Sequence, residues 1–463
     1  MLHSYVIQVT QQSSYTIDLC TRFKTRIDMQ VTKIYFILFL LATSTFGIGQ
    51  DVEMSLSEIK DNVLQRNLDI KIVDTDYALR EADYLQSRAM YYPNVSLNYT
   101  GITTSSPLMA FGTKLNQSIV TQNDFNPALL NDPDAIENFS FQLKVQQPII
   151  NLDKKHQRNA AKLGMEATLF QKERTKEHLT FAASQLYMQL QFAFEAIAVL
   201  EQALETAQTN QQHAQNSYDV GYLQKADLLQ INVRINELKN KIVAAENQTR
   251  NISDQLHTLM QNTTYPLILP AESLQLTESF IPENVSANRS DFIAMDKANM
   301  AYIEMLESEK KSILPRLNAF ATFETNDNSP IVVNATNYLI GAQISWNVFD
   351  GNQRSAKIQR AEAQLQKGQL AKQKYMAENQ AEFQKAVRMQ EQALIKLNTV
   401  KLAVEQADES LRIRSNRFEQ GLEKASDVLM AEATYSGKKL QELQTILEIN
   451  IANLYAQFLS SEK

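Results

Sequence analysis

The chain has 463 residues, a formal net charge of -7, 11 glycines and 10 prolines. Its length accommodates about two to four ordinary domains. The negative net charge gives no overall attraction to nucleic acid, and no basic stripe with interleaved aromatic residues is present, so nucleic acid is excluded as an expected partner. The stretches without glycine and proline are rich in Gln, Ala, Leu and Glu, and this composition favours long helices.

An apolar run near the N-terminus has the layout of an export signal. Residues 33–49 read KIYFILFLLATSTFGIG, a lysine followed by apolar and then small residues. We expect residues 29–49 to be a signal peptide that begins at Met29, and residues 1–28 to be a non-native upstream extension. A membrane anchor is the alternative, although about 15 apolar residues are fewer than the roughly 20 of a spanning helix.

Cysteine and histidine give no sign of a chemical site. The single cysteine, Cys20, precedes the export signal, so the exported chain has no disulfide, no cysteine metal site and no acylated cysteine anchor. The five histidines lack the spacing of metal ligands, and no nucleophile elbow, phosphate loop or zinc-binding helix motif is present. We therefore expect no enzyme activity, no catalytic residue, no cofactor and no metal.

Four segments alternate between apolar and polar side chains, which is the period of a β-strand. They are residues 95–100, 139–146, 317–323 and 338–348, and Phe320 breaks the alternation of the third. Each is close to the roughly 9 to 11 residues with which a tilted strand crosses a bilayer. A soluble four-stranded sheet is the alternative, because its strands also alternate when one face is buried.

Two very long segments favour the membrane interpretation. Residues 152–217 and 352–417 contain no proline and one glycine each, Gly164 and Gly368. An unbroken helix of that length is roughly 100 Å long, far longer than the cover of a four-stranded sheet needs to be. A shorter helical segment is expected before the first strand of each half, at residues 56–90 and 289–312.

A phrase that occurs twice indicates an internal duplication. Residues 217–230 read SYDVGYLQKADLLQ, and residues 417–430 read RFEQGLEKASDVLM. Each phrase lies between a long helix and a returning one, with Gly221 or Gly421 where a helix can end in the left-handed conformation. The two phrases are therefore predicted to be the tips of helical hairpins.

The duplication sets the expected boundaries. Residues 50–265 form the first repeat and residues 285–463 the second, with a proline-containing linker over residues 266–284. Each repeat has the order helix, strand, loop, strand, long helix, tip and returning helix. The loop of the first repeat, residues 101–138, is much longer than its counterpart at 326–337, which indicates that it partly folds over another part of the molecule.

Four strands cannot close a membrane barrel, because the smallest barrels have about eight. Other copies of the chain must therefore meet the two edges of the sheet. Two copies would supply about eight strands and three copies about twelve, and the helices would extend the barrel into a tube roughly 100 Å long. This arrangement favours a conduit.

The duplicated plan, the export signal and the phrases YDVGYLQKADLL and FEQGLEKASDVL resemble the TolC-type outer-membrane efflux protein family of Gram-negative bacteria. The resemblance covers roughly residues 51–460, and the loop phrases SSPLMAFGTKLNQ and DFNPALLNDP resemble members from the Bacteroidetes group. It implies an α+β membrane protein, a homotrimer with a twelve-stranded barrel in the outer membrane and a helical tunnel across the periplasm. It also implies a passive exit duct of a tripartite efflux or type I secretion system. The implied partners are outer-membrane lipid, a periplasmic adaptor and an inner-membrane pump of the RND or ABC type.

The same resemblance gives roles to residues at the tips. The residues expected to dock on the adaptor are Tyr218, Val220, Gly221, Tyr222, Asp227, Phe418, Gly421 and Leu422. Asp427 occupies the place of an acid that narrows the closed tunnel and is the candidate for gating and ion selectivity. Glu423 stands where the family has an Arg, and Met430 where it has a second acid, so the sequence departs from the family's ionic latch at two positions. As the alternative, Asp227 and Asp427 cap the helices that follow them.

Aromatic residues are expected to lie at the two membrane interfaces. They are Tyr99, Phe139, Phe141, Tyr338, Trp346 and Phe349. Ordinary packing within the strands is the alternative for each of them.

The chief rival to a channel is an exported periplasmic coiled-coil scaffold or adaptor without a pore, a protein that has no use for four strands of bilayer length.

Overall fold

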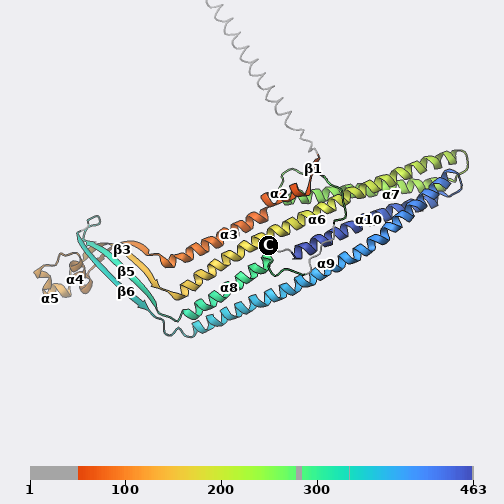
Figure 1. Ribbon diagram of the computed structural model, residues 1–463. Helices are drawn as coiled ribbons and strands as arrows, with labels where there is room; N and C mark the ends of the chain where they lie inside the picture. Colours follow the sequence, from red (N-terminus) through yellow and green to blue (C-terminus); the bar gives the residue numbers. More distant parts are fainter. Residues whose placement is uncertain (1–50, 278–283, 333, 461–463) are drawn as a thin grey trace, which may run out of the picture.

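The structure is a computed structural model that describes residues 51–277, 284–332 and 334–460 (Figure 1). The expected upstream extension (1–28) and signal peptide (29–49) lie outside the described residues, as does part of the linker. The described chain is elongated, with a sheet at one end and the tips of two helical hairpins at the other (Figure 1). Among the helices in these ranges, none is both long enough and apolar enough to cross a membrane.

The predicted strands form one antiparallel sheet of four. In spatial order they are β2 (Asn94–Thr104), β3 (Ile136–Ile150), β5 (Arg316–Asp327) and β6 (Ala335–Ser345). The prediction placed the fourth strand at 338–348, three residues closer to the C-terminus than β6 lies. β6 ends at Ser345 because its partner β5 begins at Arg316, directly after Pro315, and no further residue pair follows.

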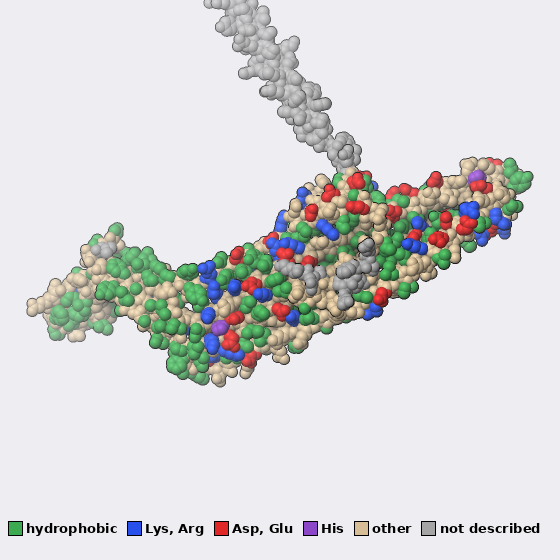
Figure 2. Space-filling model, viewed as in Figure 1, with side chains coloured by type: hydrophobic (Ala, Val, Ile, Leu, Met, Phe, Trp, Pro, Cys, Tyr) green, Lys and Arg blue, Asp and Glu red, His purple; other side chains and the backbone are tan. Residues whose placement is uncertain are grey.

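The register of the strands gives the sheet an apolar and a polar face. A row on the apolar face consists of Leu97, Leu143, Phe323 and Tyr338. The adjacent row, on the polar face, consists of Asn98, Gln142, Glu324 and Asn337. Most apolar side chains on the first face are exposed, and Figure 2 shows hydrophobic and uncharged side chains over the sheet while charged ones gather over the helices. An exposed apolar face of this kind suits lipid rather than water.

The break in the alternation of β5 is a packing feature. Phe320 lies on the polar face opposite Gly341, and a Cβ at Gly341 would come within 2.8 Å of its ring. On the apolar face of the other half, Phe139 lies opposite Gly101, where a Cβ would come within 3.0 Å of the ring. In each half of the sheet, a glycine therefore leaves the space that an aromatic ring on the neighbouring strand fills.

The first predicted helix is divided in the structure. Residues 56–90 comprise α2 (Leu56–Arg66), α3 (Leu68–Ser87) and most of the short 3-10 helix η1 (Arg88–Tyr91). Asn67 causes the division, because its side chain accepts a hydrogen bond from the Asp69 backbone (2.8 Å) and donates one to the Leu259 carbonyl (2.9 Å). The prediction of one continuous helix was therefore wrong at this residue, whose partner lies far away in the sequence.

The long helices are unbroken, as predicted. They are α6 (Leu152–Asp219) and α9 (Gln353–Glu419), and the shorter helices beside them are α7 (Lys225–Met260), α8 (Ser290–Lys311) and α10 (Ala425–Ser460). With 68 and 67 residues, the two long helices each extend roughly 100 Å. Figure 1 shows the two long helices running from the sheet to the tips, with α3 and α8 beside them near the sheet and the returning helices α7 and α10 beside them near the tips.

Two of the connections between these elements, the one between β2 and β3 and the one that follows α7, contain secondary structure of their own. The loop between β2 and β3 contains α4 (Pro107–Asn116), η2 (Gln122–Phe125) and α5 (Pro127–Asn131). The linker contains β4 (Ile268–Pro270), which pairs in parallel with β1 (Val52–Met54). The segment that follows α7 is therefore tied to the start of the described chain.

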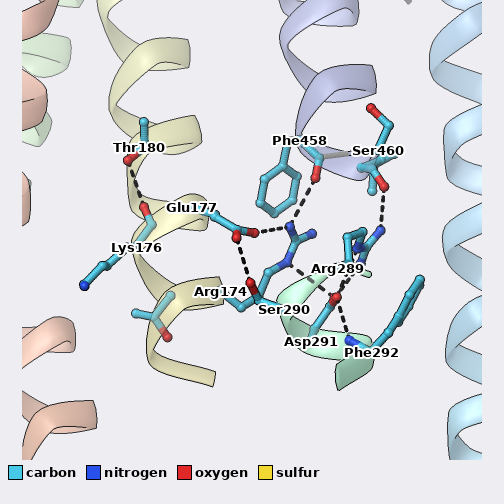
Figure 3. Close-up of polar contacts among 12 residues, drawn as sticks. Arg174, Lys176, Glu177, Thr180, Arg289, Ser290, Asp291, Phe292, Phe458 and Ser460 are labelled. Atoms are coloured by element: carbon cyan, nitrogen blue, oxygen red, sulfur yellow. Dashed lines mark hydrogen bonds and ion pairs between the residues drawn. The ribbon is translucent and has the colours of Figure 1, made fainter. Parts of the chain in front are cut away.

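A cluster of buried polar side chains joins the helices in the middle of the molecule (Figure 3). Arg289 is fully buried and donates hydrogen bonds to Asp291, to Asn379 of α9 (2.9 Å) and to the Leu459 carbonyl of α10 (2.7 Å). Arg174 of α6 also pairs with Asp291, at 3.4 Å. Elements from both repeats therefore meet around one carboxylate.

Candidate functional site

Both hairpin tips end in the same backbone turn. Gly221 and Gly421 adopt left-handed φ values of 82° and 73°. Their backbone N–H groups donate to the carbonyls of Tyr218 and Phe418 (both 2.9 Å), and the residues that follow them donate one position further back, at 2.8 Å. This pair of bonds satisfies the free carbonyls at the end of a helix and needs a residue without a Cβ at the left-handed position. The predicted role of the two glycines as helix ends is confirmed.

The side chains of the tips differ in exposure. Val220, Tyr222 and Leu422 are exposed, with Tyr222 reaching 89%. Figure 2 shows hydrophobic side chains at this end of the molecule. By contrast, Tyr218 is only 38% exposed, and Phe418 is buried in a cluster that includes residues of both hairpins. Phe418 therefore supports the tip from inside, and the surface available at the tips is formed mainly by the residues around the two glycines.

The two aspartates occupy equivalent places at the starts of the returning helices. Asp227 and Asp427 are the third residues of α7 and α10, and both are half-buried. Their backbone N–H groups donate to the carbonyls of Gln224 and Lys424, both at 3.1 Å. A negative charge in the first turn is favoured by the helix dipole. The position of each aspartate therefore suits the helix dipole and leaves its carboxylate beside the tip.

An ion pair that the sequence did not reveal fixes the second tip. Glu423 accepts hydrogen bonds from Arg414 (2.8 Å) and Arg417 (2.9 Å), both on the last turns of α9. The negative charge of Glu423 is thus paired with two positive charges of its own hairpin. The spacing of the two arginines, three residues apart on one helix face, was the available signal.

A second ion pair joins the two hairpins near the tips. Arg234 of α7 donates to Glu432 of α10 at 2.9 Å, and the Glu432 side chain is buried. Its partner is 198 residues away in sequence, so no local pattern could identify the pair. Because a buried carboxylate needs a partner, this contact fixes how the first hairpin lies against the second.

The aromatic residues predicted for the membrane interfaces lie in several places. Tyr99, Phe139, Phe141 and Tyr338 are on the apolar face of the sheet, and Trp346 and Phe349 follow β6 on the side of the helices. The Tyr99 hydroxyl donates to the Pro330 carbonyl (2.5 Å), and the Trp346 indole donates to the Ile313 carbonyl (2.9 Å). Tyr338, Trp346 and Phe349 are largely exposed.

A sheet with an exposed apolar face, joined to paired helices roughly 100 Å long, defines a subunit of a membrane channel. The model of one family, described as "Outer membrane efflux protein", matches residues 60–261 and 281–455. The chain belongs to this family. Among curated proteins, none matches it in sequence.

Solved structures of outer-membrane channels share the fold. The OprN channel has a TM-score of 0.76 at 15% identity, with 88% of this chain and 90% of that chain covered. The CmeC channel of Campylobacter jejuni has a TM-score of 0.74 at 15% identity, with 87% and 85% covered. The MtrE channel of Neisseria gonorrhoeae in its open state has a TM-score of 0.73 at 17% identity, with 88% and 89% covered.

The chain is therefore an outer-membrane efflux channel, with its strands in the outer membrane and its helices extending into the periplasm. The resemblance seen in the sequence is confirmed, and the alternatives of a soluble sheet and of a scaffold without a pore are set aside. The family is one of channels and not of enzymes.

Proposed function

We propose that three copies of the chain assemble into a twelve-stranded barrel continued by a helical tunnel, and that this duct serves a tripartite efflux or type I secretion system. The sheet carries the proposal. Its outer strands, β2 and β6, have no further neighbour within the described chain, and unpaired strand edges cannot remain in a bilayer. Three copies satisfy both edges by pairing β6 of one with β2 of the next.

The apolar face of the sheet is the proposed contact with outer-membrane lipid. Tyr99, Phe141 and Tyr338 lie on this face, and Trp346 and Phe349 lie where the strands give way to helices. Aromatic side chains form girdles at the two boundaries between hydrocarbon and headgroups in membrane barrels. Phe139, which covers a glycine, serves strand packing as well.

The tips are the proposed docking surface for a periplasmic adaptor that connects the duct to an inner-membrane pump of the RND or ABC type. Val220, Tyr222 and Leu422 leave apolar side chains exposed there, and a gathered apolar surface commonly indicates a protein contact. Gly221 and Gly421 hold these side chains in place through the two matching turns.

Asp427 is the proposed gate and selectivity residue. It lies beside the tip that Glu423, Arg414 and Arg417 hold in one conformation. Three copies around the channel axis would bring three carboxylates together, which attracts cations and repels anions. Asp227, in the equivalent place on the other hairpin, provides the matched comparison.

Planar bilayer recordings of the purified protein test the proposed duct and its gate. We expect discrete channels selective for cations, and Asp427→Ala should raise the conductance or weaken the cation preference because a charged constriction is removed. Asp227→Ala serves as the control and should change neither quantity. Absence of any conductance would reject the duct, and unchanged conductance and selectivity in Asp427→Ala would leave this residue as a helix cap.

A further inference from the structure

The long loop between β2 and β3 is a small folded unit at the outer end of the sheet (Figure 1). Lys114 of α4 pairs with Asp124 at 2.7 Å, and Asp124 also accepts hydrogen bonds from the backbone and hydroxyl of Thr121. The bond from Lys114, together with those from Thr121, lowers the pKa of Asp124 to about 2. The rings of Phe111 and Phe125 meet edge to face with centroids 5.6 Å apart. These contacts hold α4 and η2 together.

One side of α4 faces the sheet. Ala110, Thr113 and Gln117 recur at helical spacing, and all three are buried. The Gln117 amide donates to the Glu137 carbonyl (2.7 Å) and to the Asn138 side chain (2.9 Å), both at the start of β3. The loop is thus anchored on the strand that follows it.

The anchor lies on the polar face of the sheet. Asn138 donates to Asn326 of β5 (2.9 Å), Asn326 donates to Glu324 (3.1 Å), and Gln142 of β3 also donates to Glu324 (3.1 Å). By the strand register, these four residues share the polar face. Since the apolar face contacts lipid, the polar face lines the channel. The loop is therefore attached to the inner wall of the barrel.

The opposite side of α4 has apolar side chains without cover in the single chain. Leu108 is 83% exposed, and Leu115 is more than half exposed. A Cβ at Gly112, which lies between Leu108 and Leu115 on this side, would meet nothing within 4 Å. A helix that is fixed to the wall by one side directs its other side toward the channel axis.

The width of the barrel decides what can cover that side. Strands lie about 4.8 Å apart and tilt by about 40°, so twelve of them enclose a bore roughly 24 Å wide between backbones. A helix with its side chains is about 10–12 Å thick. Three helices on the wall, one from each copy, therefore reach the axis and one another.

We propose that three copies of the segment 105–135 meet on the channel axis through the face of α4 that carries Leu108 and Leu115, and that they form a constriction at the outer mouth. The occupant of each exposed apolar face is the same face of the other two copies. This inference rests on the proposed trimer. It assigns a second narrow point to the duct, at the end opposite to Asp427.

Cysteine cross-linking in the outer membrane tests this contact, in a chain whose Cys20 is replaced by Ser. Leu108→Cys should form a covalent dimer on mild oxidation, because a disulfide requires Cα atoms within about 7 Å and the three copies meet on the axis. Since a third cysteine has no mate, conversion should stop at about two thirds of the chains. Leu115→Cys, on the same face, is the second reporter if Leu108→Cys does not assemble.

Ile331→Cys is the matched control. Ile331 is 92% exposed at the same end of the sheet, in the turn between β5 and β6 on the barrel wall. Its three copies should therefore stay apart, and Ile331→Cys should form no covalent dimer. Unheated gel samples are examined first for trimers. Trimers without cross-linking at Leu108 or Leu115, or cross-linking to a different polypeptide, would overturn the constriction alone, whereas a lack of trimers in the unsubstituted chain would overturn the proposed assembly.

Discussion

Asp291 is the residue on which the middle of the molecule depends. Burial alone would raise the pKa of its carboxyl, but hydrogen bonds from Arg289 and Tyr375 and the positive charges of Arg174 and Arg289 outweigh burial and hold the pKa below its usual value. The Tyr375 hydroxyl donates to it at 2.8 Å, and burial together with this bond raises the pKa of Tyr375. One charged carboxylate therefore organises two arginines and a tyrosine from three helices.

Replacement of this carboxylate should make the free energy of unfolding less dependent on pH in the acidic range. A group with a lowered folded pKa stabilises the fold above its unfolded pKa, about 3.9 for Asp, and this contribution is lost as the pH falls through the folded pKa. Asp291→Asn should therefore lower the free energy of unfolding by about 3 kcal/mol at pH 7, because it leaves the buried Arg289 without its ion pair. The difference from the unsubstituted chain should vanish at the lowest pH values.

Urea unfolding in detergent across a pH series measures both effects. The control is Asp83→Asn, which removes an exposed ion pair with Arg80 and should change stability by less than about 1 kcal/mol at every pH. If Asp291→Asn lowers the free energy of unfolding by the same amount at every pH, the charge of Asp291 is not what stabilises the buried polar cluster.

At the scale of elements, local sequence predicted what depends on local chemistry. The alternation at 95–100 and 139–146 predicted strands, and β2 and β3 are found there. The position of Gly221 and Gly421 after long helical segments predicted that these helices end in the left-handed conformation, as they do. The loop 101–138 was expected to fold over something, but its anchor was not foreseen.

The features that were missed depend on partners remote in sequence. Asn67 divides a helix because it reaches Leu259, and Arg289 is buried because it meets Leu459, 170 residues away. Gln117 is likewise connected through Asn138 to a strand of the other repeat. Composition and periodicity carry no information about such pairs, so they become visible only when the chain is folded.

The lone glycines of the two long helices should respond in opposite ways to substitution. Gly368 of α9 lies against α8, and a Cβ there would clash with Asn299 and approach Tyr302. Gly164 of α6 has nothing within 4 Å. Gly368→Ala should therefore destabilise the protein by about 1–3 kcal/mol through overpacking, while Gly164→Ala should stabilise it by up to about 1 kcal/mol through helix propensity.

Thermal unfolding of the two variants, followed by circular dichroism in detergent, compares these effects directly. The same chemical change is made on two helices of nearly equal length, so each variant is the control for the other. Equal shifts of the melting temperature in one direction would mean that the contact between α8 and α9 does not require the glycine.

At the scale of the whole molecule, the single chain leaves surfaces that only other copies can cover. The free edges of β2 and β6 are one case. Another is an exposed apolar stripe on α9, where Ile395, Leu402 and Ile413 lie on one side of the helix. A wet tunnel wall does not need such a stripe, and apolar side chains in water are unfavourable. The stripe therefore belongs to the proposed contact between neighbouring copies.

This assignment predicts that a charge in the stripe separates the copies. Ile395 is 72% exposed in the single chain, and Ile395→Asp would bury an unpaired carboxylate at each of three interfaces, at a cost of several kcal/mol apiece. Unheated gel electrophoresis should then show monomer at temperatures where the unsubstituted protein remains a trimer. Lys385→Ala lowers the charge of the same helix by the same amount at a site 59% exposed, and it should leave the trimer intact. Equal trimer stability in both variants would move the contact between copies away from this stripe.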